Sequence, residues 1–96
     1  MNIVWTDRAS TKLEAILNEI SAEQPNAAMW VIREIRRTAE LVALWPQVGS
    51  AAPRPGVRTF PVPGTKYLLA FQHKESTVFI VSIFHGAQNW KRKFPQ

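Results

Sequence analysis

The chain has 96 residues and a formal net charge of +5, and 46% of its residues are hydrophobic. This length allows one domain over residues 1–96 with a single two-layer core, and the apolar content argues against disorder. The absence of cysteine excludes disulfides and thiolate chemistry and is typical of a cytoplasmic protein. The chain lacks both the ~20-residue apolar run of a membrane span and the pattern of a signal peptide, so we expect no membrane contact.

The positive charge is concentrated in the second half of the chain. Residues 1–48 contain five Lys or Arg and six Asp or Glu, whereas residues 49–96 contain seven Lys or Arg and one acid, Glu75. Such an asymmetry indicates a polyanionic partner, either nucleic acid or an acidic protein segment. A purely solubilising role for the charge is the alternative.

The first residues are suited to a strand followed by a helix. Asn2 to Trp5 is a short apolar segment, long enough for one strand. Thr6 or Asp7 is suited to cap the next helix, because a short side-chain oxygen there accepts a free backbone N–H. The helix has an apolar stripe made of Ala9, Leu13, Ile16, Leu17 and Ile20. This spacing predicts an amphipathic helix that Ser21–Gln24 ends.

A second helix follows directly. Pro25 fits its first turn, and Pro46 ends it. Arg36 and Glu40 face away from its apolar side at a spacing that predicts an ion pair. The apolar stripe consists of Ala28, Val31, Ile32, Ile35, Ala39 and Val42. The two segments predict a helical hairpin laid over a sheet.

The second helix has more large apolar residues than this stripe accommodates: Trp30, Leu41, Leu44 and Trp45. One explanation is a wide buried face, with Trp45 tucked under the following loop. The other is a protein-binding surface, because Trp is a preferred interface anchor. Both explanations stay open for Trp30, and we favour the buried position for Trp45.

The second half predicts a loop and three strands. Residues 47–56 are rich in Pro, Gly and Ala, which is typical of a loop. The strands are Val57–Val62, Lys66–His73 and Thr77–Phe84, joined by turns at Pro63–Gly64–Thr65 and Lys74–Glu75–Ser76. Pro61 cannot donate to a ladder, so its strand is an edge or ends there. The order β-α-α-β-β-β predicts an α+β domain with a helical hairpin on a small antiparallel sheet.

The last strand is the candidate for the central strand, because Val78–Phe84 is apolar on both faces. It stops at His85, and polar groups at the end of a rigid strand are well placed for a functional site. The cations, the acid and the base that RNA cleavage needs are available from Arg58, Lys66, Tyr67 and His85, although any basic sheet contains similar residues. Two His without Cys make no convincing zinc site, so we expect no metal and no cofactor.

These residues resemble a known family over nearly the whole chain. The matching segments are Gly56-x-Arg58, Val62-Pro63-Gly64-Thr65-x-Tyr67 and His85-Gly86-Ala87-Gln88-Asn89-Trp90, with Trp5-Thr6 and Pro46-Gln47-Val48-Gly49 in the first half. This pattern is similar to the RelE/ParE toxins of bacterial toxin–antitoxin pairs, and to the ParE branch in particular. The resemblance implies the fold given above and an antitoxin whose C-terminal segment wraps the toxin.

The resemblance also implies a choice between two targets. ParE-type toxins are associated with poisoning DNA gyrase, whereas RelE-type toxins cut mRNA in the ribosome. Gln88 stands where the family usually has an Arg and cannot neutralise a phosphate, and Phe71 stands where Tyr is common. We therefore favour a gyrase-binding toxin without chemistry of its own.

Two alternatives remain from the sequence. One is a ribosome-dependent mRNA endonuclease in which Arg58, Lys66 and His85 are the active groups. The other is an inactive module that still binds the antitoxin.

Two groups of residues are expected to bind partners. We expect Trp30, Leu41 and Trp45 to bind an acidic, ParD-like antitoxin in a hetero-oligomer. We expect the target to be bound by Arg58, Gln88, Lys91, Arg92 and Lys93, the last three attracting it through their charge.

Overall fold

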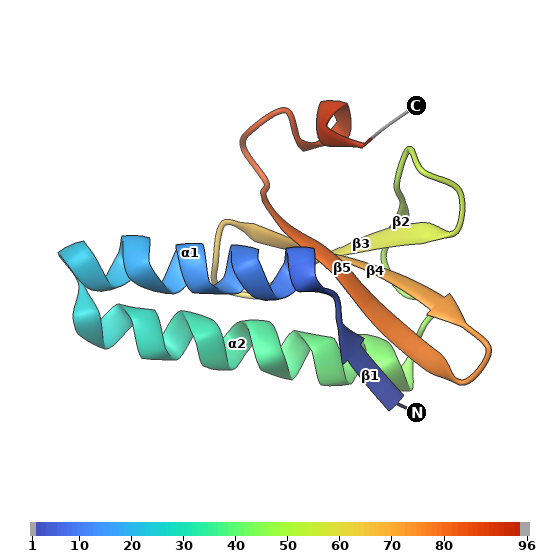
Figure 1. The fold of residues 1–96 in the computed structure, drawn as a ribbon, viewed down its shortest axis with the longest axis horizontal. Coiled ribbons are helices and arrows are strands. Elements are labelled where there is room, and N and C mark those ends of the chain that lie inside the picture. The colour runs from blue at the N-terminus through green and yellow to red at the C-terminus, as the bar shows by residue number, and fades with distance from the viewer. Residues whose placement is uncertain (1, 95–96) are drawn as a thin grey trace.

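The computed structural model describes residues 2–94, without the side chain of Lys93, and contains two long helices packed on a five-stranded sheet (Figure 1). The elements are β1 (Asn2–Trp5), α1 (Asp7–Glu23), α2 (Pro25–Leu44), β2 (Ser50–Ala51), β3 (Val57–Pro61), β4 (Tyr67–Lys74), β5 (Thr77–His85) and the 3₁₀ helix η1 (Trp90–Lys93). This arrangement confirms the predicted α+β class and the helical hairpin. No helix of residues 2–94 combines the length and the apolar character needed to cross a membrane.

The sheet is mixed, so the prediction of an antiparallel sheet is wrong for one strand pair. Its order is β1-β5-β4-β3-β2, and β1 runs parallel to β5 while the other pairs are antiparallel. A parallel pair needs a long connection between its strands. Here that connection contains the helical hairpin and three strands.

Strand β5 lies inside the sheet as predicted, but β4 is the middle strand of the five. Strand β2, which pairs with Thr59 and Arg58 of β3, lies within the segment predicted as a loop. Strand β3 ends at Pro61, which is one of the two roles predicted for that proline.

A β-bulge in β5 anchors the start of α1. Phe71 of β4 pairs with Ile80 and Ala70 pairs with Ser82, so Val81 has no partner in β4. The backbone N–H of Thr6 donates to the Ile80 carbonyl (3.1 Å), and the Thr6 hydroxyl donates to the same oxygen (2.8 Å). The Thr6 oxygen also accepts from the Ala9 N–H (3.2 Å), which confirms Thr6 as the N-cap of α1.

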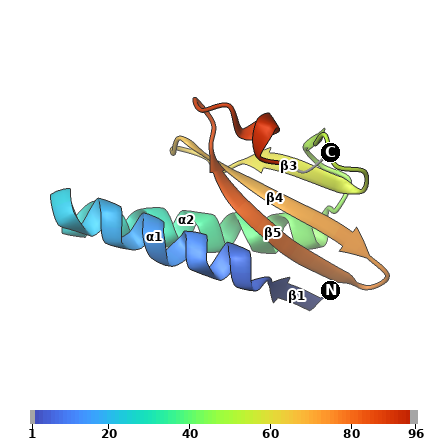
Figure 2. The same cartoon turned by 45° about the horizontal axis from the view of Figure 1, so that its top comes forward.

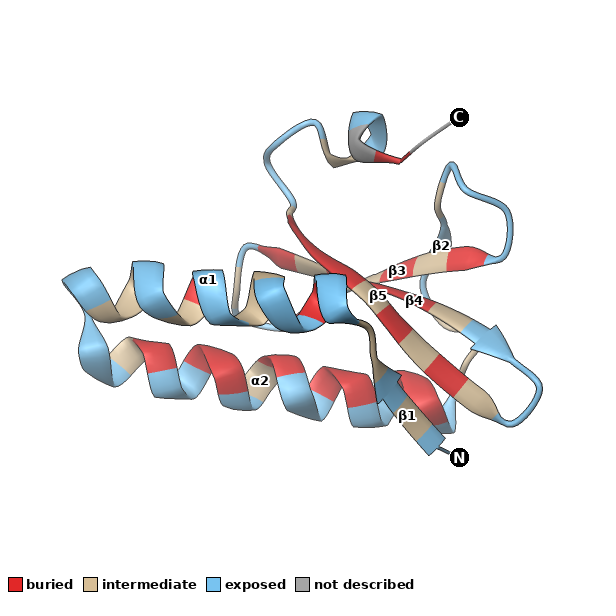
Figure 3. Cartoon of the chain, in the orientation of Figure 1, coloured by how far each residue is buried: buried red, intermediate tan, exposed pale blue. Residues whose placement is uncertain are grey.

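The helices cover one face of the sheet, and their apolar stripes form the larger core. All six predicted stripe residues of α2 are buried, along one side of the helix (Figure 3). Helix α1 continues to Glu23 and α2 begins at Pro25. Of the predicted break at Ser21–Gln24, only Gln24 is therefore outside a helix. An ion pair on α2 joins Arg37 to Glu34 (3.5 Å). The predicted ion pair between Arg36 and Glu40 does not form within residues 2–94.

The segment after β5 covers the opposite face of the sheet (Figure 2). The Trp90 ring stacks on Phe84 at 5.9 Å, and the Phe94 ring lies 5.2 Å from Phe84. Ala70 and Ser82, small side chains paired across β4 and β5, are fully buried on this side. Strand β5 is therefore covered on both faces, and Trp90 packs against the second core.

Candidate functional site

Three predicted polar residues meet at the end of β4 and β5. Tyr67 pairs with His85, and their rings pack edge to face at 6.0 Å. The Gly86 N–H donates to the Lys66 carbonyl (2.7 Å), and the Lys66 Nζ lies 6.0 Å from the centre of the Tyr67 ring. A cavity of about 110 Å³ opens beside them, lined by Lys12, Ile16, Glu19, Tyr67, Ile83, His85 and Gln88.

The imidazole of His85 is tied to the turn that follows it. Its Nδ1 accepts a hydrogen bond from the Ala87 N–H at 3.2 Å. In the neutral ring, the other nitrogen, Nε2, then carries the proton. A general base needs a free lone pair. The Nδ1 lone pair of His85 is used by the Ala87 N–H and Nε2 carries the proton, so no lone pair is left for a substrate hydroxyl.

Arg58 is also engaged within the protein. Its Nε donates to the Val48 carbonyl (2.9 Å), and its Nη2 donates to the Gly49 carbonyl (2.7 Å). Gly49 has φ +83°, and a Cβ there would collide with the carbonyl oxygen of Thr59. Arg58 thus fastens the turn between α2 and β2 to strand β3.

Arg58 does not join Lys66 and His85. Strand β4 separates β3 from β5, and Arg58 pairs with Phe71, four residues along β4 from the partner of His85. With ~4.8 Å between strands and ~3.3 Å per residue, the Cα atoms of Arg58 and His85 are roughly 16 Å apart. The proposed nuclease residues therefore fall into two separate places.

The other residues predicted to bind a target lie beyond β5. Gln88 is exposed and lines the small cavity beside His85. Lys91 and Arg92 are exposed on η1, and the Lys91 Nζ lies 5.7 Å from the centre of the Trp90 ring. The side chain of Lys93 lies outside the described part of the structure. Helix η1, which carries Lys91 and Arg92, lies on the other side of the sheet from the helical hairpin (Figure 2).

The predicted antitoxin-binding residues lie on the outer side of α2. Trp45 is 65% exposed, so the prediction that it is tucked under the loop is wrong. It caps the end of α2, and Leu44 and Trp45 line a hollow of about 310 Å³ with residues 46–48. Trp30 is 43% exposed, and a Cβ on Gly64 would lie 2.8 Å from its ring, so Trp30 also packs on the β3–β4 turn.

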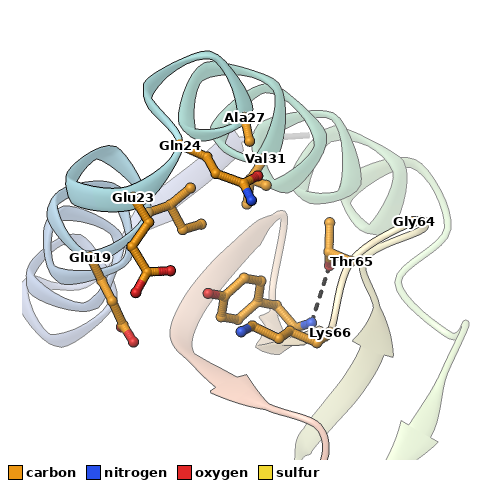
Figure 4. Close-up of a pocket in the computed structure, with 10 residues that line it drawn as sticks. Glu19, Glu23, Gln24, Ala27, Val31, Gly64, Thr65 and Lys66 are labelled. Carbon is orange, nitrogen blue, oxygen red and sulfur yellow. Dashed lines mark hydrogen bonds between the residues drawn. The ribbon is translucent and has the colours of Figure 1, made fainter.

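A larger cavity of about 360 Å³, which the sequence patterns did not predict, lies between the connected ends of α1 and α2 and the β3–β4 turn (Figure 4). Its lining includes Glu19 and Glu23 of α1 and Tyr67 of β4. Burial, together with the negative charge of Glu19, raises the pKa of Tyr67. Helix periodicity places these acids on a solvated face, and only the packing of α1 beside the turn brings them to Tyr67.

Residues 2–94 contain no group of three or more His, Cys, Asp or Glu side chains that could hold a metal ion.

Comparison with known proteins identifies the family. The family model described as the ParE toxin of the type II toxin–antitoxin system parDE matches residues 3–90. A solved structure, the chromosomal ParDE TA system from P. aeruginosa, is 23% identical and superposes with a TM-score of 0.79 over 88% of this chain and 95% of that chain. No curated protein matches the sequence. The structural likeness shows a shared fold, and the family match covers almost the whole chain. The chain therefore belongs to the ParE toxin family of type II toxin–antitoxin systems.

Proposed function

We propose that the chain is a toxin that inhibits DNA gyrase by binding it, catalyses no reaction itself, and is neutralised by an antitoxin. The observation that carries this proposal is the position of Arg58. Its guanidinium is hydrogen-bonded to the carbonyls of Val48 and Gly49, on the far side of β4 from His85.

RNA cleavage requires a base, an acid and cations around one phosphate. In this chain Arg58 is engaged elsewhere, and the Nδ1 of His85 already accepts a hydrogen bond. Gln88, exposed beside His85, offers a neutral amide in place of a charge. A nuclease would need all three residues to change their role, whereas a binding protein needs none of them to do so.

The exposed cations of η1 are suited to approach a large acidic partner. Lys91 and Arg92 project from a segment that Trp90 and Phe94 hold against Phe84. Exposed charges at the rim of an interface mainly accelerate association rather than hold the complex together. This agrees with a role in the encounter with gyrase and its bound DNA.

The outer side of α2 is suited to an acidic amphipathic antitoxin segment. Trp30, Leu41 and Trp45 are exposed at the two ends of this surface. Arg33, Arg36 and Arg37 are exposed between them. Apolar anchors around basic side chains complement a segment that carries aromatic or aliphatic residues and carboxylates. We expect toxin and antitoxin to form a hetero-oligomer through this surface.

The two targets are separated by inducing the chain in bacterial cells and measuring DNA breaks and mRNA cleavage side by side. We expect DNA breaks that follow induction, with mRNA ends unchanged. Co-expression of the antitoxin is the control and should suppress the breaks. Robust ribosome-dependent cleavage of mRNA by the unaltered chain would overturn the proposal.

A further inference from the structure

The cavity beside Gln24, where α1 ends and α2 begins, is acidic, although the protein as a whole is basic. Figure 4 shows Glu19 and Glu23 extending from α1 on one side, with Thr65 and Lys66 on the other. The remaining lining residues are Ile20, Gln24, Ala27, Val31, Gly64 and Tyr67. Apolar walls that end in carboxylates suit a ligand with an aliphatic stem and a cationic tip.

The two carboxylates have no cationic partner within the described residues. The ion pair found within residues 2–94 joins Arg37 to Glu34, and both of these residues belong to α2. The one cation that lines the cavity, Lys66, holds its Nζ over the Tyr67 ring at 6.0 Å. The site therefore presents a net negative charge to a ligand.

Tyr67 places an unpaired hydroxyl at the same cavity. The residue is 6% exposed and lines the cavity, and its hydroxyl makes no hydrogen bond within residues 2–94. The hydroxyl is not fully buried, so a ligand in the cavity can reach it. A tyrosine is neutral near pH 7 even without the raised pKa of Tyr67, and the oxygen of its hydroxyl can accept a hydrogen bond from a cation.

We propose that this cavity binds the side chain of an arginine presented by a protein partner. The acceptors are the two carboxylates and the phenol oxygen, and the donors are the N–H groups of a planar guanidinium. A guanidinium is less strongly hydrated than an ammonium and pairs with carboxylates through two parallel hydrogen bonds, so arginine fits better than lysine.

The position of the cavity indicates which partner supplies the arginine. Gly64 forms part of the cavity wall, and the ring of Trp30 lies against Gly64. A segment that crosses Trp30 on α2 thus passes the mouth of the cavity. We assign the arginine to the antitoxin segment, and this assignment rests on the proposed function.

The cavity is tested by titrating the ¹⁵N-labelled full chain with N-acetyl-arginine N-methylamide and following backbone amide shifts. We expect saturable shifts around residues 19–24 and 64–67, with a Kd on the order of 1 mM for one side chain. The double variant Glu19→Gln/Glu23→Gln should weaken binding at least about tenfold, since it removes both charged acceptors. Tyr67→Phe should weaken it by a smaller factor.

Two controls define the chemistry. Glu14→Gln removes an exposed carboxylate of α1 that lies outside the cavity and should leave the Kd unchanged. N-acetyl-citrulline N-methylamide has nearly the same shape without the charge and should not bind. Absence of saturable shifts with the arginine probe, or equal binding by the double variant, would refute the site. Free arginine binding tenfold more tightly than the blocked probe would identify a small metabolite as the ligand instead.

The assignment to the antitoxin has its own test. The antitoxin encoded beside the toxin should bind the Glu19→Gln/Glu23→Gln chain at least about tenfold more weakly than the Glu14→Gln chain. Equal affinities would overturn that assignment even if the probe binds. Neither measurement involves gyrase, so failure of the cavity and failure of the gyrase proposal give different results.

Discussion

Glu75 adopts a backbone conformation that is unfavourable for its side chain. It has φ +58°, and among the described residues it is the one non-glycine with positive φ. It lies in the two-residue connection between β4 and β5. For L-residues this conformation costs about 1–2 kcal/mol, whereas glycine adopts it freely.

Glu75→Gly should therefore raise the free energy of unfolding by roughly 0.5–1 kcal/mol, after the entropic cost of glycine is deducted. Chemical denaturation measures this change. Ser76→Gly, at the neighbouring position without positive φ, is the matched control and should bring no gain. Equal losses of stability in both variants would contradict the strain assigned to Glu75.

Tyr67 should make the stability of the protein depend on pH in the alkaline range. Its pKa is raised in the folded state by burial and by Glu19, whereas in the unfolded chain it is about 10. The unfolded chain thus releases this proton at lower pH than the folded protein does. The contribution of Tyr67 is fully present below pH ~10 and is lost as the pH rises through the folded pKa.

Tyr67→Phe removes this dependence and keeps the ring. Comparing the unfolding free energies of the two proteins between about pH 8 and 11.5 isolates the effect, because all other groups are common to both. Tyr67 is the only tyrosine of the chain, so tyrosinate absorbance reports its titration directly. Parallel stability curves for the two proteins would contradict the assignment.

Helix α1 is fixed by one threonine to the bulge of β5. The Thr6 hydroxyl accepts from the Ala9 N–H and donates to the Ile80 carbonyl. Thr6→Ala should lower stability by about 1–2 kcal/mol, because the cap and the bond to the bulge are both lost. Thr6→Ser keeps the hydroxyl and should retain most of the stability. A Thr6→Ala protein as stable as the wild type in thermal and chemical unfolding would argue against this anchor.

Arg58 should act on the fold rather than on a substrate. Arg58→Ala removes two hydrogen bonds to the turn between α2 and β2, so we expect a loss of roughly 1–2 kcal/mol, reduced from the full value because the site is partly exposed. Toxicity should fall only in proportion to the loss of folded protein. A variant that is fully stable but no longer toxic would show a direct role for Arg58 at the target.

Local patterns were sufficient to locate the helices and the three long strands. The stripe of α2, the Thr6 cap and the Gly64 turn each follow from neighbouring residues, and each was predicted. Strand β2 was not, because two residues form a strand only where Thr59 and Arg58 offer them a partner. The parallel pairing of β1 was missed for a similar reason, since it depends on where the helical hairpin returns the chain.

The site was less predictable than the fold. Residue types alone grouped Arg58 with Lys66 and His85, but the register of β3, β4 and β5 separates them. The exposure of Trp45 was also missed, because spacing on a helix does not tell which apolar residues the rest of the chain covers. Glu19 and Tyr67 meet only through tertiary packing.

On the scale of the whole molecule, the residues proposed to bind partners lie on two separate sides. The outer side of α2 carries exposed Trp residues, and η1 carries exposed cations beyond the other face of the sheet. An antitoxin on α2 and a target at η1 would therefore meet different surfaces. The cavity beside Tyr67 lies next to the first of these surfaces.

Trp45→Ala should separate antitoxin binding from folding. The side chain is 65% exposed, so its removal should change the free energy of unfolding by less than about 0.5 kcal/mol. As an interface anchor it should weaken antitoxin binding by about 2 kcal/mol, which isothermal titration calorimetry detects. Trp30→Ala should affect both quantities, because Trp30 also packs on Gly64. Unchanged affinity in folded Trp45→Ala would remove this residue from the interface.

The most direct measurement of the central claim is supercoiling of plasmid DNA by purified gyrase in the presence of the purified chain. We expect inhibition of supercoiling and accumulation of cleaved DNA. The variant Lys91→Ala/Arg92→Ala/Lys93→Ala should need a higher concentration for the same inhibition, because charge attraction accelerates the encounter. Unaffected gyrase, together with cleavage of ribosome-bound mRNA by the same preparation, would contradict the account.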